Sequence, residues 1–374
     1  MWFLQTDTFI GILVICFVMF LVNRMNAVGT TKRLVVLALL CFAFVAWVDW
    51  RLLALYLVYA AAVYFGCLVL GKLKRFRRIV FVIGVVACAI PLTAVRLWPG
   101  FEGLVIIGLA FAMLRAIDAV YYVYYTENTL KPLKFFNYMM FIPTFTAGPV
   151  FRYRDFEKQS DSLKTLSVID VTETFMRIVR GFFKTTVLAS ILQRVFDHFI
   201  GGDYTLPISF MLVVCGWLIL FLNLSGYADI AIAVGRFCGF IVPENFKKPW
   251  KAASFTVFWR SWHATVSDWI REHVYILVHN KKLGKAGSAG ISVIVMLFIG
   301  LWHGFYLQII IMSVNMGILM VIENLLGLTS PKGNSTPVTV LRCFAVNFLF
   351  GVNALLFFVD LSEVWAIVTG LFRI

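Results

Sequence analysis

The chain has 374 residues, of which 61% are apolar and only 14% are charged, and its formal net charge is +14. An ordinary soluble domain has about a quarter of its residues charged, so this composition excludes a typical soluble protein and predicts an integral membrane protein. The basic residues do not alternate with aromatic residues in a polar surface pattern. We therefore attribute the positive charge to membrane topology and expect no nucleic-acid partner.

Long uncharged segments recur along the chain from its N-terminal end. A membrane-spanning helix needs roughly 20 largely apolar residues. Segments near that length predict an all-α polytopic membrane protein of about nine to eleven spans, with short re-entrant or interfacial helices, folded as one domain over residues 1–374. The first segment follows residues 1–7, which contain no basic side chain, so we expect a retained helix and not a signal peptide. The most apolar segments are 8–23, 34–48, 52–70, 79–95, 206–224, 286–302, 304–322 and 343–359.

The first loops predict how the chain is oriented. Arg24, Lys32 and Arg33 follow the first apolar segment, and five basic residues at positions 72–78 follow the third. The hairpin between these loops, residues 49–51, is nearly neutral. Because basic loops stay in the cytoplasm, we expect both basic loops on the cytoplasmic side and the N-terminus outside.

Charged residues in the middle of the chain allow both a structural and a functional interpretation. Arg115 and Asp118 lie three positions apart in an otherwise uncharged segment, 104–125, and can pair on one helix face. Ionisable residues at membrane depth often serve a function, but we favour a structural ion pair here. Four charged residues at helical spacing predict a helix that lies at the cytoplasmic interface or begins a span with its basic side chains extended toward that interface. These are Glu173, Arg177, Arg180 and Lys184.

Three segments bring polar groups into this apolar chain. In residues 143–156, two prolines and a glycine interrupt an apolar run, which continues into Arg152 and Arg154. Such a break is tolerated at membrane depth only where the backbone is buried or lines a cavity. Residues 226–275 contain two tryptophans, an arginine and a histidine within six positions, and residues 300–304 read Gly-Leu-Trp-His-Gly.

His303 stands out because it lies in an uncharged stretch of 37 residues, 286–322, long enough for two spans with a break near His303 and Gly304. Burial at such a position favours the neutral imidazole that a general base requires. That base can take the proton of a hydroxyl that attacks an activated acyl group, a contribution of about 10²–10⁴-fold. From the spacing alone, a structural histidine or a transport path stays possible.

Other reaction classes lack support in the sequence. It contains no GxSxG motif, no zinc-binding HExxH motif and no phosphate-binding loop, so a serine hydrolase, a metalloenzyme and a nucleotide hydrolase are not indicated. The seven cysteines are scattered singly through apolar segments and predict neither a disulfide framework nor a metal site.

Several motifs occur in an order that is specific when taken together. AGPVFRYRDF, YADIAIAVGRFCGF, PENFKKPW, FWRSWH and GLWHG follow one another along the chain. They resemble the membrane-bound O-acyltransferase superfamily, and in particular its bacterial branch that acetylates polysaccharides or D-alanylates teichoic acid. The similarity is best over residues 104–325. It implies a funnel-shaped helical core and acyl transfer through the bacterial cytoplasmic (inner) membrane.

The resemblance also assigns residues to roles. The family's WHG histidine falls on His303 and its FWxxWH histidine on His263, which implies two catalytic residues, with a purely structural role as the alternative for His263. Residues implied to bind the donor or to line its tunnel are Trp302, Trp259, Arg260, Trp262, Tyr227, Asp229, Asn245, Arg152 and Arg154. Histidines that match no family position are expected to be peripheral; these are His198, His273 and His279.

The implied location of His303 differs from the one that hydropathy suggests. Two full spans over residues 286–322 place His303 at the outer surface. The family architecture places it deep in the funnel, and short or tilted helices around a cavity reconcile the two.

The implied reaction moves an acyl group, with acetyl favoured, from a cytoplasmic thioester of coenzyme A or an acyl-carrier protein. The acceptor is a hydroxyl of an extracytoplasmic polysaccharide or a partner acyltransferase on that side, and membrane lipid surrounds the protein. No bound cofactor and no metal are expected. Two departures leave the subfamily open: Ser261 stands where a second basic residue is usual, and the PLGG-type turn is missing after Tyr275. D-alanyl transfer to a teichoic-acid-like polymer and a non-catalytic acyl conduit or transporter are the alternatives.

Overall fold

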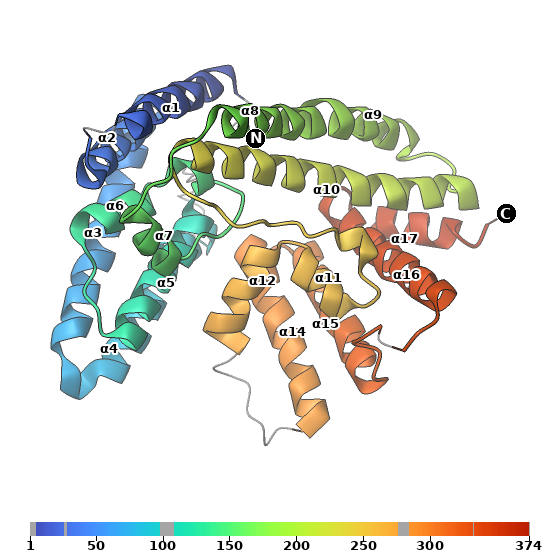
Figure 1. Cartoon of the computed structure of the whole chain (residues 1–374). Coiled ribbons are helices and arrows are strands. Elements are labelled where there is room, and N and C mark those ends of the chain that lie inside the picture. The colour runs from blue at the N-terminus through green and yellow to red at the C-terminus, as the bar shows by residue number, and fades with distance from the viewer. Residues whose placement is uncertain (1–4, 26–27, 98–107, 276–283, 332, 374) are drawn as a thin grey trace. The chain divides into compact units, whose positions relative to one another are not determined.

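The structure is a computed structural model, and it describes residues 5–25, 28–97, 108–275, 284–331 and 333–373. Helices are the only regular elements in these ranges (Figure 1). The chain divides into two compact units. The first unit is formed by residues 1–180 and 228–243, and the second by residues 181–227 and 244–374. One membrane domain over residues 1–374 stays a prediction.

The helices confirm an all-α, multi-pass membrane protein. In the described ranges, seven helices are long and apolar enough to cross a membrane, and shorter apolar helices cover Gly290–His303 and Leu361–Gly370. The seven are Thr6–Arg24, Thr30–Val48, Trp50–Lys72, Lys74–Leu97, Leu206–Phe237, Leu307–Leu325 and Thr336–Phe357. The sequence likewise predicts full spans together with shorter helices.

The first unit contains the N-terminal spans and a set of shorter helices. Asp49 lies between the span that ends at Val48 and the one that begins at Trp50. Its side chain accepts a hydrogen bond from the backbone N–H of Arg51 at 2.8 Å and so caps the second helix. The helices are α1 (Thr6–Arg24), α2 (Thr30–Val48), α3 (Trp50–Lys72), α4 (Arg77–Leu97), α5 (Leu109–Thr126), α6 (Pro132–Met139), α7 (Tyr153–Ser160) and most of α8 (Val168–Phe182).

Arg115 and Asp118 of α5 hold the broken backbone between α6 and α7. The buried Arg115 guanidinium donates hydrogen bonds to the Met139 carbonyl oxygen at 2.9 Å and to Thr144 Oγ1 at 2.8 Å. Asp118 accepts a hydrogen bond from the backbone N–H of Tyr153 at 2.6 Å. Both charges therefore stabilise the segment that prolines and glycine interrupt, which supports their structural interpretation.

The second unit is built around the C-terminal spans. Helix α10 belongs to it up to Tyr227 and continues into the first unit from Ala228. Its elements are a π-helical segment (Phe183–Leu188), α9 (Ala189–Phe199), α10 (Leu206–Phe237), η6 (Pro249–Lys251), α11 (Phe255–Ser261), α12 (Ala264–Ile270), η7 (Arg271–Tyr275), α14 (Gly284–His303), α15 (Leu307–Leu325), α16 (Thr336–Ala354), η9 (Leu355–Phe357) and α17 (Leu361–Gly370).

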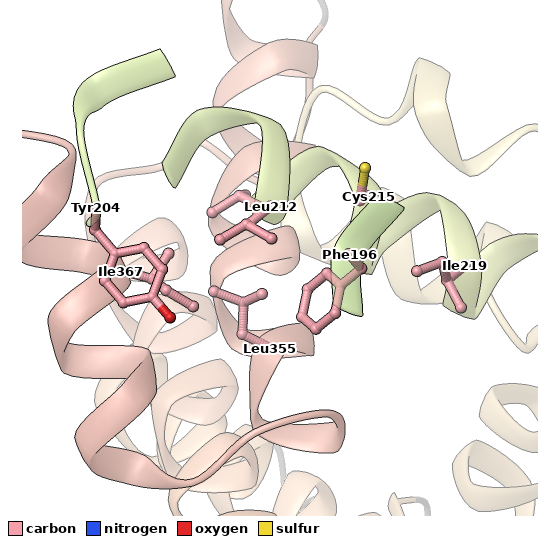
Figure 2. Packing of buried hydrophobic residues seen from close by; sticks show 8 residues of the cluster. Phe196, Tyr204, Leu212, Cys215, Ile219, Leu355 and Ile367 are labelled. Carbon is pink, nitrogen blue, oxygen red and sulfur yellow. The ribbon is translucent and has the colours of Figure 1, made fainter. Parts of the chain in front are cut away.

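A buried apolar cluster joins the two ends of the second unit. Figure 2 shows Phe196 of α9 and Leu212 of α10 packed near Leu355 of η9 and Ile367 of α17. Residues from distant parts of the sequence thus share one core, which fixes the C-terminal helices against α9 and α10. This core supports the helices that carry the site described next.

Candidate functional site

The helical hairpin of α14 and α15 places His303 at its turn (Figure 1). His303 is the last residue of α14, and α15 begins at Leu307. A Cβ atom at Gly304 would come within 2.9 Å of the exposed Tyr306 ring, so a larger residue at this turn would require the tyrosine to move. The predicted break near His303 and Gly304 is confirmed.

The prediction that His303 is buried is wrong. Its side chain is exposed, whereas the neighbouring Trp302 is buried. The imidazole lies between two aromatic rings, with centroid distances of 4.7 Å to Trp302 and 6.2 Å to Phe357. An uncharged sequence around a histidine indicates apolar neighbours along the chain, but a residue at a helix end can still face open space.

A tight turn between α11 and α12 places His263. His263 has a positive φ of 48°, a left-handed conformation that is uncommon for residues other than glycine. The backbone N–H of Ala264 donates to the Asn245 carbonyl oxygen at 2.8 Å, and the N–H of Lys247 donates to the Ser261 carbonyl oxygen at 2.8 Å. Two hydrogen bonds therefore tie this turn to the segment before η6.

The half-buried imidazole of His263 has a well-defined environment. The Asn245 amide nitrogen lies 3.3 Å from His263 Nδ1. Burial, with a smaller contribution from nearby His303, lowers the pKa of His263 to about 3. The imidazole is therefore neutral near pH 7.

Both histidines line one cavity of about 170 Å³ in the second unit, which we call the histidine cavity. Its walls come from α10, α11, α12, α14, α15, α16 and η9. The lining residues are Leu220, Leu224, Trp259, Trp262, His263, Val266, Ser267, Met296, Ile299, His303, Met312, Ser313, Phe350 and Phe357. An apolar cavity of about 150 Å³ holds a benzene molecule, so the histidine cavity has room for a small acyl group.

Aromatic rings make one wall of the histidine cavity rigid. Trp262 is buried and stacks on Phe258 at a centroid distance of 5.4 Å, and its ring lies 4.8 Å from that of Phe350. Trp259 lines the same cavity, and its indole nitrogen is buried with no hydrogen-bond partner among the described residues. Both tryptophans of the FWRSWH motif thus line the histidine cavity.

Close packing of α14 and α15 brings Ser313 to the same cavity. A side chain at Gly317 would come within 2.9 Å of the Val293 Cα atom, so small residues allow the two helices to approach. Ser313 is buried and donates a hydrogen bond to the Ile309 carbonyl oxygen at 2.7 Å. Its hydroxyl oxygen keeps the capacity to accept a further hydrogen bond.

The other predicted site residues lie elsewhere. Arg260 is exposed and Tyr227 is buried, and neither lines the histidine cavity. Asp229 belongs to the first unit, where Arg177 Nε donates to its carboxylate at 2.9 Å. Arg177 is one of the four charged residues predicted at helical spacing between positions 173 and 184. Its side chain is largely buried in this ion pair.

Arg152 and Arg154 also belong to the first unit. Arg154 is exposed, lies 3.8 Å from the Asp155 carboxylate, and lines a separate polar cavity of about 460 Å³. Acidic and basic side chains share that cavity, with Lys131 and Lys158 beside Glu157 and Asp161 among the lining residues.

The three remaining histidines have different surroundings. His198 is exposed on α9, as expected for a peripheral residue. His273 is buried and stacks on Trp269 at a centroid distance of 4.3 Å, and it is not among the residues that line the histidine cavity. His279 lies outside the described residues.

Glu323 is a residue of this unit that sequence reasoning missed. The carboxylate is buried at the end of α15 and accepts hydrogen bonds from Thr256 N at 2.9 Å and Thr256 Oγ1 at 2.7 Å, and also from the Phe255 N–H. These are the first residues of α11, the helix that leads to His263. A carboxylate at a helix N-terminus accepts hydrogen bonds from otherwise unpaired N–H groups. Its negative charge also interacts favourably with the positive end of the helix dipole. A single acid at the end of an apolar span was the available signal.

Replacing Glu323 by alanine is expected to lower the free energy of unfolding by about 2–3 kcal/mol, because two backbone N–H groups lose their acceptor in a buried site. Thermal unfolding of the purified protein in detergent, followed by circular dichroism, measures the loss. Glu173→Ala, at an exposed position on α8, is the control and should leave the midpoint unchanged. An unchanged midpoint in Glu323→Ala would contradict the capping role.

Metal ligands do not gather in the described ranges. No group of three or more His, Cys, Asp or Glu side chains lies close enough there to hold a metal ion. Each of the seven cysteines is a free thiol, and six of them are buried.

Comparisons with known proteins agree with this arrangement. The family model of MBOAT, the membrane-bound O-acyltransferase family, matches residues 109–367. The chain is 32% identical over 235 residues to the probable alginate O-acetylase AlgI of Pseudomonas fluorescens, which covers 62% of this chain and 47% of that protein. It therefore spans about half the length of the alginate O-acetylases that it matches.

Two further relatives are named for transfer to teichoic acid and to peptidoglycan. The chain is 28% identical over 274 residues to the teichoic acid D-alanyltransferase of Streptococcus thermophilus, covering 67% of this chain and 65% of that protein. It is 28% identical over 182 residues to the peptidoglycan O-acetyltransferase of Helicobacter pylori, covering 46% of this chain and 34% of that protein. The family match extends over most of the chain and includes both histidines of the cavity, so the chain belongs to the membrane-bound O-acyltransferase family.

Proposed function

We propose that this protein transfers an acyl group, with acetyl favoured, from a cytoplasmic thioester to a hydroxyl of an extracytoplasmic polysaccharide. The thioester is carried by coenzyme A or an acyl-carrier protein. The transfer is made directly or through a partner acyltransferase on the outer side, and the protein works in the bacterial cytoplasmic membrane. The observation that carries the proposal is the histidine cavity, which joins His263 and His303 in a small apolar space.

The cavity chemistry suits a neutral acyl group. Apart from its two histidines, the cavity is lined by apolar, indole and hydroxyl side chains, so it contains no carboxylate or ammonium group that would favour a charged ligand. A largely apolar lining gives water few hydrogen-bond partners beside a bound thioester. A thioester carbonyl and a short acyl chain are the groups that this lining accommodates.

His303 serves as the general base in the proposed reaction. The neutral imidazole accepts the proton of the attacking hydroxyl while the hydroxyl oxygen forms a bond to the thioester carbonyl carbon. The carbon–sulfur bond then breaks, and the imidazolium returns its proton to the leaving thiolate. The products are an oxygen ester and a free thiol, and the proton passes through His303 without net change.

Basic residues before and within η6 support a cytoplasmic, acidic donor. Lys247, Lys248 and Lys251 are exposed, and the Lys247 N–H is bonded to the C-terminal end of α11 beside His263. Exposed bases next to a site attract phosphates of coenzyme A or acidic residues of a carrier protein and raise the association rate.

D-alanyl transfer is the second candidate. It is favoured by the teichoic acid D-alanyltransferase of Streptococcus thermophilus, of which this chain covers 65%, against 47% for the alginate O-acetylase of Pseudomonas fluorescens. The cavity lining does not separate the two, since an added ammonium group can extend outside a pocket of this size.

The experiment uses the full-length protein in proteoliposomes. Acetyl-CoA with a labelled acetyl group, and an acyl-carrier protein loaded with labelled D-alanine, are offered separately with alginate oligosaccharide or teichoic acid. Mild base then releases the ester-linked group, and its identity is determined by mass spectrometry. We expect labelled acetate from the glycan with acetyl-CoA.

Other outcomes discriminate among the candidates. Labelled D-alanine from the polymer would replace the acetyl assignment with the second candidate. Labelling that requires an added partner transferase and persists in His303→Gln would favour a non-catalytic conduit and overturn the proposed catalysis.

A further inference from the structure

The Asn245 side chain has a defined orientation. Asn245 is 1% exposed, and its Oδ1 atom accepts hydrogen bonds from Thr265 N at 3.3 Å and from Thr265 Oγ1 at 2.8 Å. The backbone N–H of Thr265 can only donate, so the oxygen of the amide must face Thr265. The amide nitrogen consequently faces His263 Nδ1, at 3.3 Å.

This orientation decides where the His263 proton lies. An amide nitrogen donates hydrogen bonds and accepts none, so His263 Nδ1 must be the acceptor. In a neutral imidazole the other nitrogen then carries the proton. The nitrogen available to a ligand in the histidine cavity is therefore Nε2, and it can only donate.

We propose that Asn245 is a positioning residue that holds His263 with its proton on Nε2, so that His263 donates a hydrogen bond to the acyl carbonyl oxygen in the histidine cavity. The two histidines then have different tasks, since His303 accepts a proton and His263 stabilises the oxyanion. This inference rests on the proposed acyl transfer. It assigns His263 a role distinct from that of the base.

Backbone contacts strengthen the assignment. The positive φ of His263 and the hydrogen bond from Ala264 N to the Asn245 carbonyl oxygen fix the imidazole relative to the amide. Such preorganised donors make the largest contributions to oxyanion stabilisation, and removal of one donor typically costs about 10²–10³-fold in rate.

Among the described residues of the second unit, few titratable groups lie near His263. Helix α14 contributes His303 to the cavity, and this is the other titratable side chain in its lining. The lining residues from α10, α12, α15, α16 and η9 are apolar or hydroxyl side chains. Arg260 of α11 and Lys247 are exposed. A carboxylate introduced at position 245 would therefore be the dominant new charge acting on the imidazole.

The tautomer is measured directly by NMR of the purified full-length protein with ¹³C,¹⁵N-labelled histidine. The His263 signals are identified from their absence in His263→Gln. We expect the wild-type protein to show protonated Nε2 and unprotonated Nδ1. Asn245→Asp should move the proton to Nδ1, because a carboxylate only accepts. A wild-type His263 protonated on Nδ1 would overturn the inference.

The acyl-transfer rates of two variants show whether His263 acts as a hydrogen-bond donor or as a base. The Nε2 amide group of glutamine can place an N–H donor near the position of imidazole Nε2, but it cannot accept a proton from a substrate. His263→Gln should therefore retain transfer within about tenfold of wild type, whereas His263→Ala should lose about 10²–10³-fold. Equal losses in the two variants would contradict the donor role.

The pH dependence of Asn245→Asp gives an independent test. The carboxylate favours the imidazolium and raises the pKa of His263 above its wild-type value. Above that raised pKa, Nε2 has no proton and transfer falls by about 10²-fold. Below it both nitrogens are protonated, so the Nε2 donor returns. The ratio of variant to wild-type activity should therefore rise as the pH falls through the raised pKa, which an NMR titration of the variant's His263 locates.

The controls distinguish a failure of the inference about Asn245 from a failure of the proposed acyl transfer. Asn334→Asp, at an exposed position, adds the same charge and should leave both rate and pH profile unchanged. An activity ratio in Asn245→Asp that stays flat while the pH crosses the NMR titration of the variant's His263 would indicate a merely structural role and overturn the inference. Absence of acyl transfer in the wild-type protein would overturn the proposed function, while the NMR result would still decide the tautomer.

Discussion

Replacing His303 by glutamine is expected to lower the rate of acyl transfer by about 10²–10⁴-fold, the contribution that a positioned general base makes. Glutamine preserves the length and polarity of the side chain, but it cannot accept and return a proton. The loss should appear in kcat and kcat/KM alike, because proton transfer occurs only in the transition state. Labelled acetyl-CoA and alginate oligosaccharide in proteoliposomes provide the rates.

The control for His303→Gln is His198→Gln, since His198 is exposed on α9 and belongs to the same unit. It should retain wild-type activity. His303→Gln should also retain the wild-type thermal midpoint, because the side chain is exposed and forms no part of the core. A variant that folds normally and transfers acetyl at the wild-type rate would remove His303 from the reaction.

Replacing Arg115 by methionine is expected to destabilise the protein by about 3–5 kcal/mol, the range for loss of a hydrogen-bonded buried charge. Methionine fills a similar volume but donates no hydrogen bonds, so the carbonyl oxygen of Met139 and the hydroxyl of Thr144 lose their partner. Met139 ends α6 and Thr144 lies in the interrupted segment that follows it, so the guanidinium ties the two together.

Thermal unfolding in detergent and limited proteolysis of the 138–144 segment provide the measurement for Arg115→Met. Arg78→Met, at an exposed position, removes the same charge without a buried network and should change the midpoint little. An Arg115→Met protein with normal stability and lost acyl transfer would show that the arginine serves the reaction and not the fold.

The predictions from sequence succeed where local apolar patterning decides the structure. Long uncharged segments form helices in the membrane because each helix satisfies its own backbone hydrogen bonds. The break at Gly304 follows from the residue types at the turn. The motif FWRSWH places Trp259, Trp262 and His263 in one cavity because a short helix and a tight turn bring neighbouring residues to one side.

The same reasoning fails where contacts join distant positions. Sequence hydropathy indicates that His303 is buried, yet its side chain is exposed at a helix end. Asp229 belongs to a recognisable motif, but its partner Arg177 lies 52 positions away. Neither the exposure of a helix end nor the partner of a charge is visible in a window of neighbouring residues.

The sequence by itself therefore determined the all-α membrane fold, the family motifs and the two histidines. These features depend on composition and on residues close together in the chain. Only the tertiary structure decided that Glu323 caps α11 and that Asn245 turns its amide nitrogen toward His263. Their partners lie 67 and 18 positions away. Such contacts depend on how separate helices pack, because a buried polar group bonds to whichever donor or acceptor the fold brings beside it.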